Sequence, residues 1–127
     1  MRNLSTNGPF ASYHGDRVPN MPWLFGGVML RTQVEALATA TDELSLSWFS
    51  RYVHQFYRDW ESNGAPEYRQ VVDSQLVHSL AVTYVLRGAT SVSSSFEVQN
   101  LTDEKVYDVY GVQKPGRAFY VKITFDM

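Results

Sequence analysis

Apolar and polar residues alternate along much of this chain, and this period-two pattern constrains the fold more than any other feature. Between Leu44 and Trp60, the even-numbered positions are mostly apolar or aromatic, whereas the odd-numbered positions are mixed and largely polar. Successive side chains of a β-strand point to opposite faces, whereas a helical face repeats every ~3.6 residues. The β-branched and aromatic content also favours a strand over the competing helix. The segment is therefore predicted to be one strand, far longer than the usual ~5–6 residues.

Four further segments alternate in the same way. They are residues 24–38, where the pattern is weaker, 76–87, 92–99 and 119–127. Short and long connections follow each other along the chain. The short ones are 38–42 and 88–91, and the long polar ones, which contain Gly and Pro, are 61–73 and 103–117. The sequence therefore predicts an all-β fold of about five long antiparallel strands, with residues 1–12 irregular.

Composition excludes several classes of protein. The chain has 127 residues, of which 44% are hydrophobic and 19% charged, which indicates a folded chain of one domain at most. A formal net charge of −2 argues against nucleic-acid binding, which needs an excess of Lys and Arg. The absence of cysteine excludes disulfides, thiolate metal sites and a cysteine nucleophile. No apolar run is long enough for a transmembrane helix, and no signal peptide is visible.

Aromatic residues make up 14% of the chain, and many lie near the ends of the predicted strands. Transmembrane β-barrels carry aromatic girdles at both membrane surfaces, tight turns on one side and longer loops on the other. The alternative is a soluble antiparallel β-sheet that binds a partner and uses these aromatic side chains to fill a core. Alternation alone favours neither interpretation.

The C-terminal third carries a motif that distinguishes them. Asn100, Leu101, Asp103 and Tyr107 lead into a loop, and Pro115, Gly116 and Arg117 then open the last alternating segment. This arrangement resembles the end of a TonB-dependent outer-membrane receptor. Met127 stands where that family has a terminal Phe. Residues 13–22 resemble a further segment of the family, Y-x-G-x-R-x-P-x-x-P, so the resemblance covers residues 13–127.

The resemblance implies that residues 1–127 are the C-terminal segment of a transmembrane β-barrel, without its plug domain, in the bacterial outer membrane. The implied partners are outer-membrane lipid and the barrel-assembly machinery, with the TonB complex acting only through a missing N-terminal part. The family imports scarce ligands such as metal–siderophore complexes, and this chain is not expected to transport alone. Its ligand stays open, and no enzymatic activity or cofactor is expected. The assembly signal would consist of Phe119, Val121, Ile123, Phe125 and Met127.

The resemblance also places the long loops outside the cell, where ligands are contacted. The candidate contacts in these loops are Trp60, Glu61, Tyr68, Arg69 and residues 107–113, which include Tyr110. Lipid is expected to face Tyr52, Phe56, Val82, Phe96, Val98 and Val121. The opposite, polar face is expected to carry Arg31, Glu35, Arg51, Gln55, Glu97, Gln99 and Lys122.

Conventional catalytic and metal-binding patterns are missing. His14, His54 and His78 have no metal-ligand spacing, and His54 and His78 fall on the predicted lipid face. Asp59 and Glu61 are better explained as a solvated strand end and loop than as a catalytic carboxylate pair. The sequence therefore predicts neither a catalytic site nor a metal site.

Overall fold

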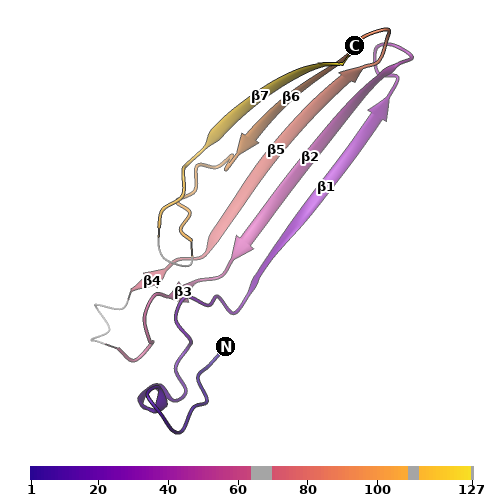
Figure 1. Cartoon of the computed structure of the whole chain (residues 1–127). Coiled ribbons are helices and arrows are strands. Elements are labelled where there is room, and N and C mark those ends of the chain that lie inside the picture. The colour runs from indigo at the N-terminus through magenta and orange to yellow at the C-terminus, as the bar shows by residue number, and fades with distance from the viewer. Residues whose placement is uncertain (64–69, 109–111, 127) are drawn as a thin grey trace. The chain divides into compact units, whose positions relative to one another are not determined.

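The structure is a computed structural model that describes residues 1–63, 70–108 and 112–126. It is 52% strand and 3% helix, so the predicted all-β fold class is confirmed. A five-stranded sheet has the order β1-β2-β5-β6-β7, and a second sheet pairs β3 with β4 (Figure 1). The strands are β1 Phe25–Glu35, β2 Asp42–Val53, β3 Phe56–Tyr57, β4 Val71–Val72, β5 Gln75–Leu86, β6 Ser91–Gln99 and β7 Ala118–Asp126.

The five long strands lie side by side in the order in which they follow along the chain. They match the five alternating segments of the sequence. Residues 36–41 join β1 to β2, and residues 87–90 join β5 to β6, so both predicted short connections are turns between neighbouring strands. The β2–β5 connection contains a short additional pair of strands, β3 and β4.

The N-terminal segment contains little regular structure. Residues 1–10 form no strand, although Arg2 makes an isolated antiparallel bridge with Arg17. A short 3-10 helix, η1, covers Ala11–Tyr13. In the part of the chain that the structure describes, no helix is both long and apolar enough to cross a membrane.

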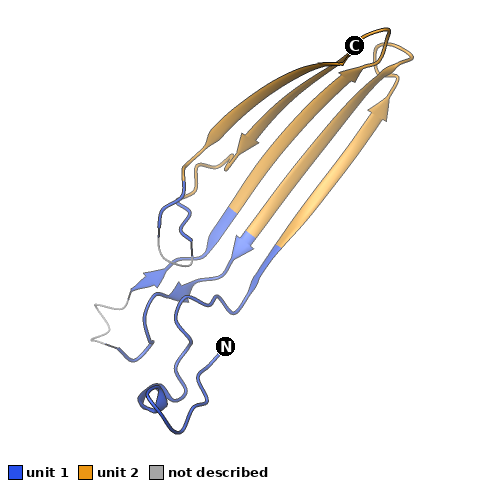
Figure 2. Cartoon of the chain, viewed as in Figure 1, with its two compact units in different colours: residues 1–26, 52–76, 105–114 blue, residues 27–51, 77–104, 115–127 orange. Residues whose placement is uncertain are grey.

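The chain divides into two compact units, which Figure 2 shows in different colours. Unit 1 contains residues 1–26, 52–76 and 105–114, and therefore includes η1, β3 and β4. Unit 2 contains residues 27–51, 77–104 and 115–127, and therefore includes most of the five-stranded sheet.

Strand register in unit 2 aligns the apolar positions of neighbouring strands. Val82 of β5 pairs with Phe96 of β6, which pairs with Val121 of β7. Because side chains alternate between faces, every second row points to the same face of the sheet, and these rows are mostly apolar. These rows are Leu80–Val98–Phe119, Val82–Phe96–Val121, Tyr84–Ser94–Ile123 and Leu86–Val92–Phe125. The period-two pattern therefore predicted this face correctly.

Backbone bonds at both ends of the β1–β2 pair fit one uninterrupted register. The Ala36 N–H donates to the Asp42 carbonyl at 2.9 Å, and the His54 N–H donates to the Leu24 carbonyl at 2.9 Å. In this register Leu30 lies across from Trp48, which extends the apolar face to the first strand.

The prediction of one continuous strand from Leu44 to Trp60 is wrong. β2 ends at Val53, and Phe56 and Tyr57 instead pair with Val72 and Val71 in the separate β3–β4 sheet. The Asn20 N–H also donates to the Tyr57 carbonyl at 2.7 Å. Alternation continues through this region of the sequence, but contacts with distant residues end the strand.

Few apolar side chains are buried, and two of them were predicted to face outward. In unit 1, Phe56 is 3% exposed, and Val72, its partner in the β3–β4 pair, and Val106 are also buried. The expectation that Phe56 faces lipid is therefore wrong, because the chain leaves the long strand before this residue. Val98 keeps its predicted place on the apolar face of unit 2, but it is only 5% exposed.

Candidate functional site

The apolar face of the five-stranded sheet is one candidate surface. On β7, Val121 is 70% exposed and Phe125 is 65% exposed, and on β1 Val28 is 61% exposed. The register places Phe96, which is 43% exposed, beside Val121. Monomeric soluble proteins rarely expose contiguous apolar patches larger than a few hundred Å². A sheet face of this composition therefore requires an apolar environment or a partner.

The opposite face of the same sheet is polar. Register aligns Ala81 with Glu97 and Tyr120, and Thr83 with Ser95 and Lys122. Glu97, Gln99 and Lys122 thus lie on the face that the sequence predicted. The positions of Arg31, Glu35 and Arg51 in β1 and β2 fit that face by alternation. Gln55 does not belong to it, because it follows the end of β2 and lies in unit 1.

Among the residues that the structure describes, no further strand pairs with either edge of the sheet. β1 and β7 are the outer strands, and each has one hydrogen-bonded neighbour in the described sheet. β1 is eleven residues long and exposed throughout, and β7 is nine residues long. Long, exposed edge strands present rows of free N–H and C=O groups that readily pair with further strands.

The predicted family motif forms a defined cluster in unit 2. Asn100 and Asp103 both adopt positive φ, 52° and 56°, where the loop after β6 turns sharply. The Asn100 side chain accepts the Glu104 N–H at 2.9 Å and donates to the Glu104 carbonyl at 2.8 Å. The Leu101 N–H donates to the His78 carbonyl at 2.8 Å, which ties the loop to β5. This end of the motif thus closes the loop locally.

Asp103 connects the two halves of the motif. Its Oδ1 accepts the Arg117 N–H at 2.8 Å. A Cβ at Gly116 would lie 2.6 Å from the same Oδ1, so a side chain at position 116 would collide with the carboxylate. Pro115 is exposed and precedes this contact. The structure therefore gives Asn100, Asp103, Gly116 and Arg117 a common role in holding the loop between β6 and β7.

Tyr107, the remaining motif residue, lies in unit 1. Its N–H donates to Oε1 of Gln75 at 2.8 Å, and Gln75 is 3% exposed. An isolated bridge also pairs Tyr107 with Gln113. Tyr107 thus helps to fold its own loop back onto the start of β5.

The predicted ligand-contact residues of the other long loop make contacts within unit 1. The Trp60 ring stacks on Tyr13, with centroids 4.8 Å apart and planes 4° apart, and lies 5.7 Å from the Phe10 ring. Glu61 contacts Arg2 and Arg17, as described below. Tyr68, Arg69 and Tyr110 lie outside the described residues, as does Met127.

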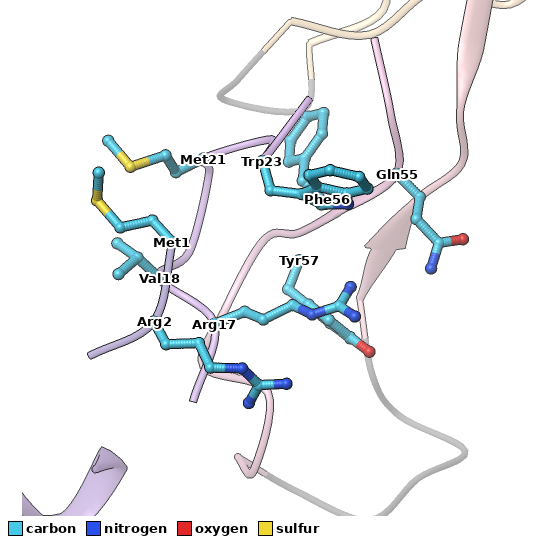
Figure 3. Close-up of a pocket in the computed structure, with 9 residues that line it drawn as sticks. All are labelled: Met1, Arg2, Arg17, Val18, Met21, Trp23, Gln55, Phe56 and Tyr57. Atoms are coloured by element: carbon cyan, nitrogen blue, oxygen red, sulfur yellow. The ribbon is translucent and has the colours of Figure 1, made fainter. Parts of the chain in front are cut away.

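A pocket in unit 1 has no signature in the sequence. It has a volume of about 280 Å³ and lies among residues from the N-terminal segment, the stretch before β1 and the region of β3 (Figure 3). Its polar side chains are Arg2, Arg17 and Gln55, and its apolar wall includes Met21, Trp23 and Phe56. These residues come from segments far apart in sequence, so no local motif could have revealed them.

Asp42 organises the turn between β1 and β2. It is 2% exposed and accepts the N–H groups of Leu37, Ala38 and Thr39 at 2.7, 2.9 and 3.1 Å. The Tyr84 hydroxyl donates to the same carboxylate at 2.7 Å. The Tyr84 bond, together with the three backbone bonds, holds the pKa of Asp42 below its usual value of 3.8 despite burial. The ionised Asp42 carboxylate thus stabilises the turn. It lies outside the apolar stretch that starts at Leu44.

His54 and His78 make separate contacts and do not form a common site. In unit 2, His78 Nδ1 lies 2.6 Å from Ser50 Oγ. In unit 1, His54 Nδ1 lies 2.9 Å from the Tyr52 hydroxyl, and its ring packs edge-on against Trp23 at 5.0 Å. Within residues 1–63, 70–108 and 112–126, no three His, Asp or Glu side chains form a group that could hold a metal ion.

Comparison with protein-family models, with curated proteins and with solved structures found no significant match to this chain.

Proposed function

We propose that this chain is the C-terminal barrel segment of a TonB-dependent receptor in the bacterial outer membrane, where it takes part in uptake of a scarce ligand such as a metal–siderophore complex. One observation carries the proposal: a single sheet exposes a continuous apolar face on one side and a polar face on the other. Strands of transmembrane barrels alternate in this way, with the apolar residues toward lipid.

Strand length supports the membrane environment. A tilted strand needs ~9–11 residues to cross the hydrocarbon core of a bilayer. β1 has 11 residues, β2 and β5 have 12 each, and β6 and β7 have 9 each. All five strands of the sheet are therefore long enough.

The unpaired edges determine how many further strands a closed barrel would need. In lipid, each unsatisfied backbone group costs several kcal/mol, so β1 and β7 must both acquire neighbours. β1, β5 and β7 run in the same direction, because each neighbouring pair of the sheet is antiparallel (Figure 1). Antiparallel closure therefore requires an odd number of further strands. A ring of identical five-stranded copies would instead place β7 of one copy parallel to β1 of the next.

The loop between β6 and β7 supports the assignment to this receptor family. Three of the residues that carry the resemblance contact one another, with Asp103 bonded to Arg117 and in contact with Gly116. Lipid and the barrel-assembly machinery are the proposed partners of this segment, with β7 as the assembly signal. Transport would require the remaining strands, a plug and the TonB complex.

Spin labelling tests the membrane proposal, and the lack of cysteine makes the chain suited to it. Single variants Phe96→Cys and Val121→Cys place a nitroxide on the apolar face, and Ser95→Cys and Lys122→Cys place it on the polar face one residue away. In dodecylmaltoside micelles, the first pair should be relaxed mainly by oxygen and the second pair by a water-soluble nickel chelate.

The alternative, a soluble β-sheet binding module, gives the opposite result. The chain would then fold cooperatively as a monomer without detergent, and labels at Val121 and Lys122 would be equally accessible to the nickel chelate. That outcome would overturn the membrane proposal.

A further inference from the structure

Two arginines lie side by side at the pocket of unit 1. Arg2 and Arg17 are directly opposite each other in an isolated antiparallel bridge. Figure 3 shows their side chains extending next to each other. Like charges directly opposite in a β-pair are destabilising unless an anion compensates them.

One carboxylate serves both arginines. Oε2 of Glu61 lies 3.8 Å from Arg2 Nη1 and 4.0 Å from Arg17 Nε, and it also accepts the Arg17 N–H at 3.2 Å. Arg2 Nη1 donates in addition to the Gly15 carbonyl at 2.5 Å. The cluster therefore has two positive charges and one negative charge. Both guanidinium groups keep free donors, since each guanidinium carries five N–H groups.

Apart from Gln55 and the Tyr57 hydroxyl, the other side chains that line the pocket are apolar. Phe56 forms a buried wall, and Met21 and Trp23 remain 45% and 56% exposed. Arg17 also lies over the ring of Tyr57, 5.7 Å from its centroid. A ligand that fits this pocket combines an anionic group, for the arginines, with an apolar portion, for Met21 and Trp23.

Chain position favours a lipid over other amphiphiles. Trp23 precedes the first residue of β1 by two positions, and Gln55 follows the last residue of β2 by two. If the sheet crosses a bilayer, as proposed above, these positions adjoin the membrane surface, where lipid phosphates lie. Two guanidinium groups and the Gln55 amide present several donors, which suits the oxygens of a phosphate better than a single carboxylate.

We propose that the pocket lined by Arg2, Arg17, Met21, Trp23 and Phe56 binds the phosphate headgroup and the first acyl carbons of an anionic lipid. Arg2 and Arg17 contact the phosphate, and Trp23 and Met21 contact the acyl chain. The inference rests on the proposed membrane location for the identity of the ligand.

Titration of the full chain in dodecylmaltoside micelles tests the site, with the indole N–H resonance of Trp23 as the signal. Trp23→Phe assigns that resonance, and the indoles of Trp48 and Trp60 serve as internal controls for general partitioning. Dioctanoyl phosphatidic acid should shift the Trp23 signal saturably. Dioctanoylglycerol, which lacks the phosphate, should not, and inorganic phosphate should bind at least about tenfold more weakly.

Charge variants show whether the arginines make the contact. Arg2→Gln and Arg17→Gln should each weaken phosphatidic acid binding about tenfold, which is the effect of losing about 1.4 kcal/mol from a charge-assisted hydrogen bond. Arg17→Lys should restore part of the affinity, and a preserved amide spectrum shows that each variant folds. Arg31→Gln, on exposed β1, is the matched control and should bind as the unaltered chain does.

Each contrary result is decisive. Equal affinity of Arg17→Gln and Arg31→Gln, or the absence of a saturable Trp23 shift, would overturn the site. Inorganic phosphate binding as tightly as phosphatidic acid would replace the lipid with a free-phosphate ligand. The spin-label measurement at Val121 reports separately on the membrane location, so failure of the pocket and failure of the proposed function are distinguishable.

Discussion

Asp103 and Gly116 contact each other across the loop that joins β6 to β7: a Cβ at Gly116 would lie 2.6 Å from Asp103 Oδ1. The same oxygen accepts the Arg117 N–H at 2.8 Å. The glycine therefore leaves the space in which the carboxylate reaches the following backbone amide. The resemblance noted from the sequence thus involves residues that depend on one another physically.

Gly116→Ala should displace the Asp103 carboxylate and break its bond to Arg117. Losing one hydrogen bond to a charged group predicts a decrease of about 1–2 kcal/mol in the free energy of unfolding, measured by urea titration in micelles. Gly26→Ala is the control, because a Cβ at Gly26 has no neighbour within 4 Å. Equal effects of the two substitutions would contradict the packing argument.

Asn100 supports the same loop from its other end. Asn100→Ala removes two hydrogen bonds to Glu104 and leaves a residue with a Cβ at a φ of 52°. The combined loss predicts a destabilisation of about 2–3 kcal/mol in the same urea titration. Asn100→Gly separates the two contributions, because glycine adopts positive φ without strain but still lacks the side-chain bonds. If Asn100→Gly restored full stability, the bonds to Glu104 would contribute nothing.

The alternation of the sequence was sufficient to predict the long strands and their apolar face. Period two fixes which side chains of a strand share a face, and the structure aligns these positions across strands, as in the row Val82–Phe96–Val121. The end of β2 could not be predicted in this way, since alternation continues past Val53. That end accompanies the pairing of Phe56 and Tyr57 with Val72 and Val71 and the Asn20–Tyr57 backbone bond, all of which join residues distant in sequence.

The pocket was unpredictable for a related reason. Arg2 and Arg17 meet only because their segments form an isolated bridge, and Glu61 reaches them from a loop more than forty positions away in the chain. Glu61 was assigned to a ligand-contact loop, but no periodic pattern links it to the arginines. Long-range electrostatic contacts of this kind leave no local trace in the sequence.

Protonation of Asp42 should destabilise the turn between β1 and β2. Because the folded state lowers the pKa of Asp42 below 3.8, the ionised carboxylate stabilises the fold. This contribution is fully present above the ordinary pKa and is lost as pH falls through the lowered, folded-state value. NMR titration of the Asp42 carboxyl carbon should thus give a midpoint below 3.8, with stability decreasing over the same acidic range.

Tyr84→Phe is the informative variant for this titration, because the Tyr84 hydroxyl makes the largest contribution to the lowered pKa of Asp42. The variant should move the Asp42 midpoint upward, toward its usual value. Tyr52→Phe, whose hydroxyl contacts His54 instead, should leave the midpoint unchanged. A midpoint at or above 3.8 in the unaltered chain would show that the Asp42 bonds do not favour its charged form.

The two faces of the sheet should differ in their tolerance of charge if the apolar face meets lipid. Val121 is 70% exposed, so a lysine there meets no steric obstacle and would cost little in water. In a membrane, a lysine on the lipid face costs about 2–4 kcal/mol near the midplane, whereas a lumen-facing lysine costs far less.

Val121→Lys and Phe96→Lys should therefore strongly lower the free energy of unfolding in lipid bilayers. Ser93→Lys and Gln99→Lys, on the opposite face, should be nearly neutral. Phe96 lies on β6 together with Ser93 and Gln99, so the comparison within β6 keeps the strand constant and changes only the face. Equal tolerance at the four positions would place both faces in water and remove the basis for a lipid-facing sheet.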